Sequence, residues 1–486
     1  MTDTKPLPKN EVKQEVEEGT GISWTAEDEL SLRWKIDLRV FPVLIVLFIL
    51  NFMDRNNFAN ARLKGLQNDL KMSDVEYQTC ISILLVGYVI CQVPSNMILN
   101  ILSRPSRYLC ACAATWGVIS AATGSVQNPT GAIMCRFFLG CVEASLFPGS
   151  IYFLSRWYTR REMQLRVTLL NVGNLLAQAF GGLIAAGILG TMDGTAGIRA
   201  WRWLFILEGV ITITCAAVAA FILPDYPSTT SWLSAREKLI CQNRLDCDLG
   251  GPDTTNDDPT ITTALHGLKQ AVTDPKVWLL GHAYHCTIMA SSFSYFFPTI
   301  TQSLGYGTTT TLLLTAPPWI WSAMISLPNA WHADRVGERF FHYLGPAVAC
   351  MTGYIVAMTT TATAPRYISM FLMTMGYSCG FVMLGWISST IPRSPAKRAA
   401  AIAIINAMGN IGSIPGSYIF PSNYGPYYVK SFGAELAILA FACLCALALR
   451  MYLARLNSKL DQEEREHVSH IDSVEYQHVK SFRYIY

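Results

Sequence analysis

An apolar run of fourteen residues, 40–53, is followed directly by the charged and polar sequence Asp54-Arg55-Asn56-Asn57. Fourteen helical residues rise about 21 Å, which is short of the roughly 30 Å hydrocarbon core of a bilayer. A helix that starts at Val40 and spans the membrane must therefore carry Asp54 and Arg55 into it. Charges in the membrane cost several kcal/mol unless they have partners or face a polar cavity, so this pair is a candidate for function.

The composition of the whole chain is that of a membrane protein. Of its 486 residues, 51% are hydrophobic and only 15% are charged, whereas soluble domains carry about 25% charged residues. The net charge of +3 gives no indication of a nucleic-acid partner. The fourteen cysteines show no paired C-x-x-C spacing, which predicts small buried side chains and no metal or other cofactor.

Apolar stretches long enough to span a bilayer occur twelve times. The first six lie near 40–59, 77–100, 107–126, 131–155, 167–190 and 201–223, and the second six near 277–300, 312–332, 342–361, 367–390, 399–421 and 431–454. We therefore predict an all-α membrane protein of twelve transmembrane helices in two six-helix bundles. The predicted parts are an N-terminal tail (1–37), a first bundle (38–223), a central loop (224–276), a second bundle (277–454) and a C-terminal tail (455–486).

Lysine and arginine gather in the short connections on one side of these spans, and cytoplasmic loops carry such an excess. The residues are Arg104, Arg107, Arg156, Arg160, Arg161, Arg166, Arg335, Arg339, Arg393, Lys397 and Arg398. This predicts that both termini and the central loop are cytosolic. We expect a multi-pass protein of the plasma membrane, with the vacuole or another internal membrane as the alternative.

The central loop contains an amphipathic run, 232–238, and a glycine-bearing stretch, 250–253. The first predicts a surface helix that tethers the two bundles, and the second a flexible segment. A plain linker is an equally good interpretation of the whole loop. A weak internal repeat also indicates two halves, because the charged joints 103–107 and 334–339 occupy matching places in them.

A second charged helix contains Arg136 and Glu143, seven residues apart and thus close to one helical face. The helical rise places Asp54, Arg55 and Arg136 near one depth and Glu143 near the membrane midplane. Glu143 is the best candidate, since a carboxylate at that depth has no route to water. The alternatives are that Arg136 reaches the outer interface or a loop carboxylate, and that Asp54-Arg55 is a local pair at a helix end.

Two arginines and two carboxylates sum to zero charge, which makes an empty cavity tolerable. Protonation of a carboxylate leaves an arginine uncompensated, and a substrate carboxylate can then bind that guanidinium in a bidentate fork. Proton and anion would bind cooperatively, as linkage requires. Our hypothesis assigns the proton to Asp54 and Glu143 and the anion to Arg55 and Arg136.

Further polar and aromatic side chains are weaker candidates for substrate contacts. Amides at helical spacing form stripes, and interhelical hydrogen bonding explains them equally well. A histidine in a span is more often structural than titrating. Tyr284, Tyr295 and Trp386 could stack on an aromatic acid, although membrane aromatics usually pack or anchor the helix. These candidates are Asn57, Tyr88, Gln92, Asn171, Asn174, Gln178, His285, Trp386, Asn406 and Asn410.

The chain resembles the major facilitator superfamily through the joint Asp334-Arg335-Val336-Gly337-Glu338-Arg339. Segments 35–66, 87–99, 136–149, 201–210 and 223–238 resemble most closely the fungal anion:cation symporter group, the allantoate permease family. The resemblance implies a proton-coupled importer of a small organic anion such as a vitamin, ureide or aromatic acid, with Asp334, Arg335, Gly337 and Arg339 in a gating loop. The joint 103–107 departs from the superfamily pattern because it lacks the acidic residue.

The expected partners are therefore a small organic anion, protons and the lipid bilayer, and we expect a monomer. Export of an acidic metabolite would leave the same charges and the same fold. A transporter-like nutrient receptor is a third possibility, which the short predicted tails disfavour. An enzyme is not expected, because the sequence shows no metal-ligand cluster and no phosphate-binding glycine loop.

Overall fold

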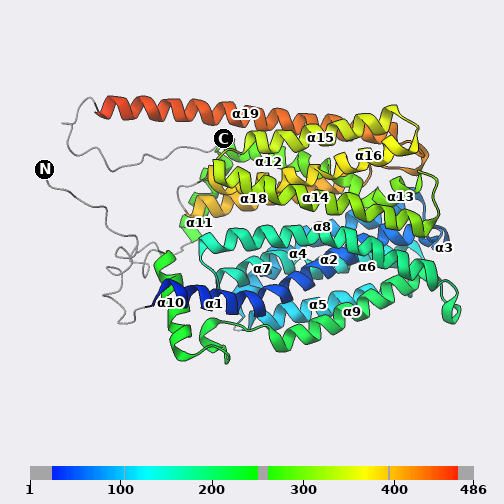
Figure 1. Cartoon of the computed structure of the whole chain (residues 1–486), viewed down its shortest axis with the longest axis horizontal. Helices are drawn as coiled ribbons and strands as arrows, with labels where there is room; N and C mark the ends of the chain where they lie inside the picture. Colours follow the sequence, from blue (N-terminus) through cyan, green and yellow to red (C-terminus); the bar gives the residue numbers. More distant parts are fainter. Residues whose placement is uncertain (1–23, 103, 250–260, 392–394, 469–486) are drawn as a thin grey trace.

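The computed structural model describes residues 24–102, 104–249, 261–391 and 395–468, and in these ranges the chain is helical and contains no strand. The helices run along the long axis of the molecule in two groups (Figure 1). Eight of them are long and apolar enough to cross a membrane by length and composition alone. Proline-bearing and broken helices complete the twelve predicted spans.

The first group, which we call the N bundle, contains the spans of the N-terminal half. They are α2 (Phe41–Arg62), α4 (Asp74–Ile101), α5 (Pro105–Thr123), α6 (Pro129–Glu143) with α7 (Leu146–Ser155), α8 (Arg160–Thr191) and α9 (Ala200–Ile222). The short α3 (Leu66–Asp69) follows α2. The α6–α7 break comes directly after Glu143, at the depth where the sequence predicts a functional carboxylate.

The second group, the C bundle, contains the spans of the C-terminal half. They are α12 (Pro275–Met289) with η4 (Ser292–Phe296) and α13 (Phe297–Gln302), α14 (Thr308–Val336), α15 (Phe340–Thr359), α16 (Thr363–Thr374) with α17 (Gly376–Thr390), α18 (Pro395–Gly416) and α19 (Val429–Val468). Two of these spans are interrupted, after Met289 and after Thr374. Such interruptions are tolerated at membrane depth where the backbone is buried in protein or lines a cavity.

The two ends of the molecule differ. One end, the tail end, carries α1 (Ala26–Arg39), α10 (Ala235–Leu249), α11 (Ile261–Val272) and the last turns of α19 (Figure 1). The opposite end, the far end, carries α3 (Figure 1). The common location of α1 and the end of α19 agrees with an even number of crossings.

The observed helices extend beyond the predicted spans at both ends of the chain. A capping box at Thr25 and Asp28 starts α1 inside the predicted N-terminal tail. At the other end α19 continues to Val468, although the apolar stretch stops near 454, because the following residues are rich in good helix formers. The remaining tail residues, 1–23 and 469–486, lie outside the described ranges.

The central loop is largely helical, and its first helix docks on the N bundle. Lys35 of α1 pairs with Glu237 of α10 at 2.8 Å, and Arg244 of α10 pairs with Glu162 of α8 at 3.0 Å. Trp232 stacks on Trp157 with ring centroids 5.9 Å apart. The amphipathic run therefore leads into a helix that packs on protein, and the predicted flexible stretch 250–253 lies outside the described ranges.

The two bundles are joined at the far end by hydrogen bonds. Ser422 of η5 (Ser422–Tyr424) donates its backbone N–H to Asp74 at 3.1 Å and its hydroxyl to the same carboxylate at 2.5 Å. Arg62 donates to the Ser422 hydroxyl at 3.0 Å. Closer to the centre, the Tyr418 hydroxyl lies 3.1 Å from the hydroxyls of both Thr79 and Ser82. The far end of the interface is therefore closed in this conformation.

Candidate functional site

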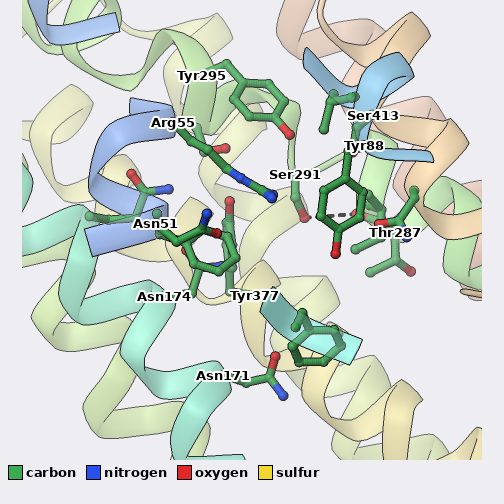
Figure 2. Close-up of a pocket in the computed structure, with 18 of the residues that line it drawn as sticks. Asn51, Arg55, Tyr88, Asn171, Asn174, Thr287, Ser291, Tyr295, Tyr377 and Ser413 are labelled. Carbon is green, nitrogen blue, oxygen red and sulfur yellow. Dashed lines mark hydrogen bonds between the residues drawn. The ribbon is translucent and has the colours of Figure 1, made fainter. Parts of the chain in front are cut away.

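A cavity of about 200 Å³ lies between the two bundles, lined by α2, α4, α6, α7 and α8 on one side and by α12, η4, α17 and α18 on the other. One water molecule needs roughly 10–15 Å³ by the same measure, so a small organic molecule fits. Arg55, Ser291, Tyr295 and Tyr377 are drawn from both walls around a common space (Figure 2). Binding at the interface of two repeats near the midplane is the arrangement expected of a rocking transporter.

An ion pair forms the charged part of the cavity wall. Arg55 Nε donates to Glu143 Oε2 at 2.6 Å, and the Glu143 carboxyl is fully buried while the Arg55 side chain is 16% exposed. Glu143 Oε1 has no hydrogen-bond partner. The guanidinium also lies over the Tyr88 ring at 4.7 Å. Arg55 is thus a partly accessible cation whose compensating carboxylate keeps one oxygen available for a proton.

Close packing of helices positions this pair. Gly140, three residues before Glu143, lets α6 approach α4 so closely that an added Cβ would lie 1.9 Å from the backbone oxygen of Leu84. The helix α6 then ends at Glu143, and α7 restarts at Leu146. The carboxyl is therefore fixed at the break between two short helices and cannot move with a flexible loop.

The predicted amide stripes lie on the cavity wall. Asn171, Asn174 and Gln178 of α8 line it from the N bundle, and Asn406 and Asn410 of α18 line it from the C bundle. Asn51 and Asn56 of α2, which the sequence reasoning did not single out, add two further amides. These groups can donate and accept hydrogen bonds without adding net charge.

Arg136 does not line the cavity. It is 3% exposed, and its guanidinium donates to the backbone oxygens of Arg55 at 3.0 Å, Asp54 at 3.4 Å and Cys80 at 3.4 Å. The predicted direct contact with substrate is thus replaced by a contact with the backbone of α2. The snorkelling alternative is not observed either, because the side chain is buried among helices.

Asp54 also points away from the cavity. Its carboxylate accepts hydrogen bonds from Ser120 of α5 at 2.7 Å and from Thr212 of α9 at 3.5 Å, and it is 1% exposed. Successive residues of a helix point about 100° apart, so Arg55 faces the cavity and Asp54 faces the interior of the N bundle. Although Asp54 and Arg55 are adjacent in the sequence, the first side chain lies inside the N bundle and the second lies on the cavity wall.

Glu208 of α9 is a buried carboxyl that the sequence reasoning missed. It is 2% exposed, it accepts a hydrogen bond from the Asn57 amide, and its other oxygen has no partner. The charges of Glu208 and Asp54 act on each other directly. Asn57, predicted to contact substrate, instead holds this second carboxyl. The signal was present in the sequence, since Glu208 stands alone inside an apolar span.

Three weaker candidates lie off the cavity wall. Gln92 is half-buried on α4, one turn from Tyr88, which does line the cavity. His285 Nδ1 lies 2.8 Å from the backbone oxygen of Met408 and joins α12 to α18, in agreement with a structural histidine. Trp386 is fully buried in the core of the C bundle.

A family model described as Major Facilitator Superfamily matches residues 44–417, which is most of the chain. The chain belongs to the major facilitator superfamily. A relative named MFS transporter prlL, from Fungal sp. (strain NRRL 50135), is 32% identical over 93% of each chain. The "Putative tartrate transporter" of Agrobacterium vitis is 29% identical over 87% of this chain and 92% of its own.

Solved structures of superfamily members share the fold. A bacterial homolog of the human lysosomal transporter Spinster, inward-facing and occupied, has a TM-score of 0.65 at 14% identity, covering 85% of this chain and 96% of its own. The xylose transporter XylE from E. coli, partially occluded and inward open, has a TM-score of 0.62 at 14% identity, covering 84% and 97%. The predicted all-α fold is thus confirmed, and the chain is a membrane transporter and not an enzyme.

The superfamily loop between α14 and α15 lies at the tail end, and none of its residues lines the cavity. Asp334 and Arg339 form an ion pair at 2.5 Å, with Arg339 almost buried and its guanidinium against Gly385 of α17. Gly337 ends α14 with a positive φ of 70°, a conformation that favours glycine. Arg335 lies over the Trp331 ring at 5.2 Å. The loop therefore anchors neighbouring C-bundle helices and does not contact the cavity.

Much of the cavity wall of the C bundle was not predicted, although the sequence offered Tyr284 and Tyr295 as possible stacking partners of an aromatic acid. The unpredicted hydroxyl and aromatic side chains come from the broken span α12–η4 and from α17 and α18, namely Thr287, Ser291, Ser294, Tyr377, Phe381 and Ser413. These residue types are common in membrane helices, so their position on one wall is not visible in the sequence. No cluster of metal ligands occurs among the described residues.

Proposed function

We propose that this transporter is a proton-coupled symporter of a small organic anion, as the resemblance to the anion:cation symporter group implies. The observation that carries the proposal is the Arg55–Glu143 ion pair at 2.6 Å on the wall of a cavity shared by both bundles. Arg55 is the cation that an anionic substrate can reach, and Glu143 is the group that it must replace.

Electrostatics makes the binding of proton and anion cooperative. At an effective dielectric of about 20, opposite charges 4 Å apart attract by about 4 kcal/mol. While Glu143 is ionised it compensates Arg55, and a substrate carboxylate would add an uncompensated negative charge. When Glu143 takes up a proton, the guanidinium loses its partner and accepts the substrate carboxylate instead. Linkage then requires that bound anion favours the proton equally.

The buried charges of the N bundle support a role for protons. Arg55 and Arg136 stand against Asp54, Glu143 and Glu208, so full ionisation of these five groups leaves one excess negative charge, whereas the buried Arg166 has its own partner in Asp37. A buried uncompensated charge is strongly unfavourable. One proton held between Asp54 and Glu208 neutralises the set in the resting state. A second proton, on Glu143, accompanies the substrate.

A name among the relatives agrees with an anionic substrate. The Agrobacterium vitis protein is named for tartrate, a dicarboxylate. From the contacts that close the far end and from the cytosolic location that we propose for the tail end, we infer an inward-facing conformation. We further propose that the protein acts as a monomer in the plasma membrane and carries its substrate into the cell.

The test is transport by purified protein in proteoliposomes, with a panel of labelled carboxylates and an imposed pH gradient. Wild-type protein should accumulate its substrate only with the proton gradient, and a substrate pulse should move protons with it. Glu143→Gln should abolish proton-driven accumulation and retain counterflow exchange, because the amide resembles the protonated carboxyl. Glu27→Gln, which removes an exposed carboxyl at the tail end, is the matched control.

Unchanged proton-driven accumulation by Glu143→Gln would remove Glu143 from the coupling. Uptake of the substrate without any change in external pH would contradict symport itself. Uptake by whole cells at acidic external pH distinguishes import from the alternative of export, since an exporter would lower the cellular content of the labelled acid.

A further inference from the structure

The two walls of the cavity differ in charge. The charged lining residues, Arg55 and Glu143, both come from the N bundle, whereas the described lining residues of the C bundle carry no ionised side chain. Aromatic rings line both walls, but on the C-bundle wall they stand without a charged neighbour, at Tyr284, Tyr295, Tyr377 and Phe381. A molecule that fills the cavity thus meets charge at one side and flat uncharged surfaces at the other.

One of these rings is held rigidly from behind. Tyr377 packs edge to face against Trp319, with ring centroids 5.0 Å apart and planes at 88°, and against Phe293 at 6.5 Å and 87°. Trp319 and Phe293 are themselves buried. A ring fixed in this way is a preorganised platform for a planar ligand, because no side-chain freedom is lost on binding.

Next to this platform α17 lacks a side chain. Gly380 lines the cavity one turn after Gly376, and a Cβ at Gly380 would meet no atom within 4 Å. By contrast, a Cβ at Gly376 would lie 2.9 Å from the Cys350 sulfur, so Gly376 is explained by helix packing. Glycine inside a helix is unfavourable relative to alanine. Packing does not explain Gly380, and its effect is to leave open space beside Tyr377 and Phe381.

The open space beside Gly380 and the Arg55 guanidinium belong to the same cavity. In Figure 2 the Arg55 guanidinium is directed between Tyr295 and Tyr377. Tyr295 and Arg55 line the same cavity from opposite bundles. A ligand that places a carboxylate on Arg55 can therefore place the rest of its body against the aromatic wall.

We infer that the space beside Gly380 receives the planar ring of a carboxylic acid whose carboxylate is bound by Arg55, so that Gly380 determines the size of the substrate. The inference rests on the proposed function, because it takes Arg55 as the anion site. It narrows the substrate class to ring-bearing organic acids, in which the ring stacks on Tyr377 and Phe381 and the amides of the N bundle orient the carboxyl end.

The experiment measures equilibrium binding of three probes to the purified full-length protein at acidic pH. The probes are 4-hydroxybenzoate, cyclohexanecarboxylate and hexanoate, which share one carboxylate and differ in having a planar ring, a puckered ring or no ring. Wild-type protein should bind 4-hydroxybenzoate at least about tenfold more tightly than hexanoate. This ratio of affinities corresponds to the upper part of the free-energy range for one aromatic pair.

Gly380→Leu should fill the space and weaken 4-hydroxybenzoate binding by about tenfold or more, while hexanoate binding changes by less than about twofold. The matched control is Gly345→Leu in α15, where a Cβ also meets no atom within 4 Å and the residue is exposed outside the cavity. This control should leave all three affinities and the melting temperature unchanged.

Equal affinity for 4-hydroxybenzoate and hexanoate, or an equal loss of both in Gly380→Leu, would overturn the inference and leave the proposed function standing. Affinity for cyclohexanecarboxylate equal to that for 4-hydroxybenzoate would overturn the stacking of a planar ring. A different result would contradict the proposed function as well. In that result none of the three acids binds, and Arg55→Lys cannot be distinguished from wild type in binding and uptake, so Arg55 is not the anion site.

Discussion

Arg136 Nη2 donates to the backbone oxygen of Arg55 at 3.0 Å, so the two arginines lie one behind the other instead of side by side. Only Arg55 reaches the cavity. The Arg136 guanidinium donates hydrogen bonds to the backbone oxygens of Asp54 and Arg55. These bonds fix the rotation of α2 about its own axis. We assign Arg136 as a positioning residue and Arg55 as the residue that touches the substrate.

The two arginines should therefore respond differently to lysine substitution. Arg136→Lys should lower the melting temperature, because hydrogen bonds to a charged donor contribute roughly 1.5–3 kcal/mol each and the planar fork is lost. Arg55→Lys should leave stability nearly unchanged and raise KM about tenfold or more, since a bidentate contact with the substrate carboxylate is lost. Thermal unfolding and uptake kinetics measure the two effects. A raised KM with normal stability in Arg136→Lys would return Arg136 to the anion site.

The sequence predicted that Asp54, Arg55 and Arg136 lie at one level along their helices, but it did not predict the direction in which their side chains point. Charged residues are conspicuous inside apolar spans, and the helical rise places them along the membrane normal. Rotation about the helix axis depends on packing, such as the Gly140–Leu84 contact, which a single sequence does not display. The predicted amides of α8 do lie on the cavity wall. Asp54 and Arg136 were also expected on this wall, but their side chains lie behind it because packing sets the rotation of their helices.

Glu208 illustrates a different limit. It occurs alone in its span, and its significance depends on Asp54 and Asn57, which come from a helix about 150 positions earlier in the chain. Likewise, the aromatic wall of the C bundle combines Tyr284 and Tyr295, which flank the break after α12, with Tyr377 and Phe381 from α17. Hydroxyl and aromatic residues are ordinary in membrane helices, so their common orientation could not be read from the sequence.

The carboxyls of Asp54 and Glu208 should be separable from Glu143 by mutation. Glu208→Gln keeps an oxygen that accepts the Asn57 hydrogen bond and removes one ionisable group. We expect the variant to fold with a melting temperature close to that of wild type, to bind substrate and to keep the number of protons transported per anion, because the transported proton is held by Glu143. Reversal potentials in proteoliposomes measure this ratio. A lower ratio in Glu208→Gln would show that a proton held by Asp54 and Glu208 is also transported.

The far-end contact between Asp74 and Ser422 should stabilise the present conformation. Asp74→Ala removes two hydrogen bonds from Ser422, each with a net value of about 0.5–1.5 kcal/mol, so the open far end should gain roughly tenfold or more in population. Spin labels at Lys64 and Tyr424 would report a longer and broader distance distribution. The control is Asp193→Asn, which lies outside this contact. Identical distributions for Asp74→Ala and wild type would show that other contacts hold the far end.

The docking of α10 on α1 should depend on acid pH through Glu237. Burial raises the pKa of this carboxyl, but the hydrogen bonds from Lys35 and from the Ser234 backbone N–H lower it more, so its pKa lies below the ordinary value of 4.5. A carboxyl with a lowered pKa stabilises the docked state above its ordinary pKa, and this contribution is lost as the pH falls through the lowered pKa. We therefore expect the docking of α10 to weaken only at pH values below the ordinary carboxyl pKa of 4.5.

Hydrogen exchange of α10 in the full-length protein, followed from pH 7 to pH 3, measures this docking once the rates are corrected for intrinsic pH dependence. Protection should be constant at neutral pH and decrease at the acid end. Glu237→Gln should reduce protection at neutral pH to nearly its acid value and remove the pH dependence, because the amide forms no ion pair with Lys35. Persistent pH dependence in that variant would assign the effect to the other ion pairs of this surface, such as Arg244–Glu162.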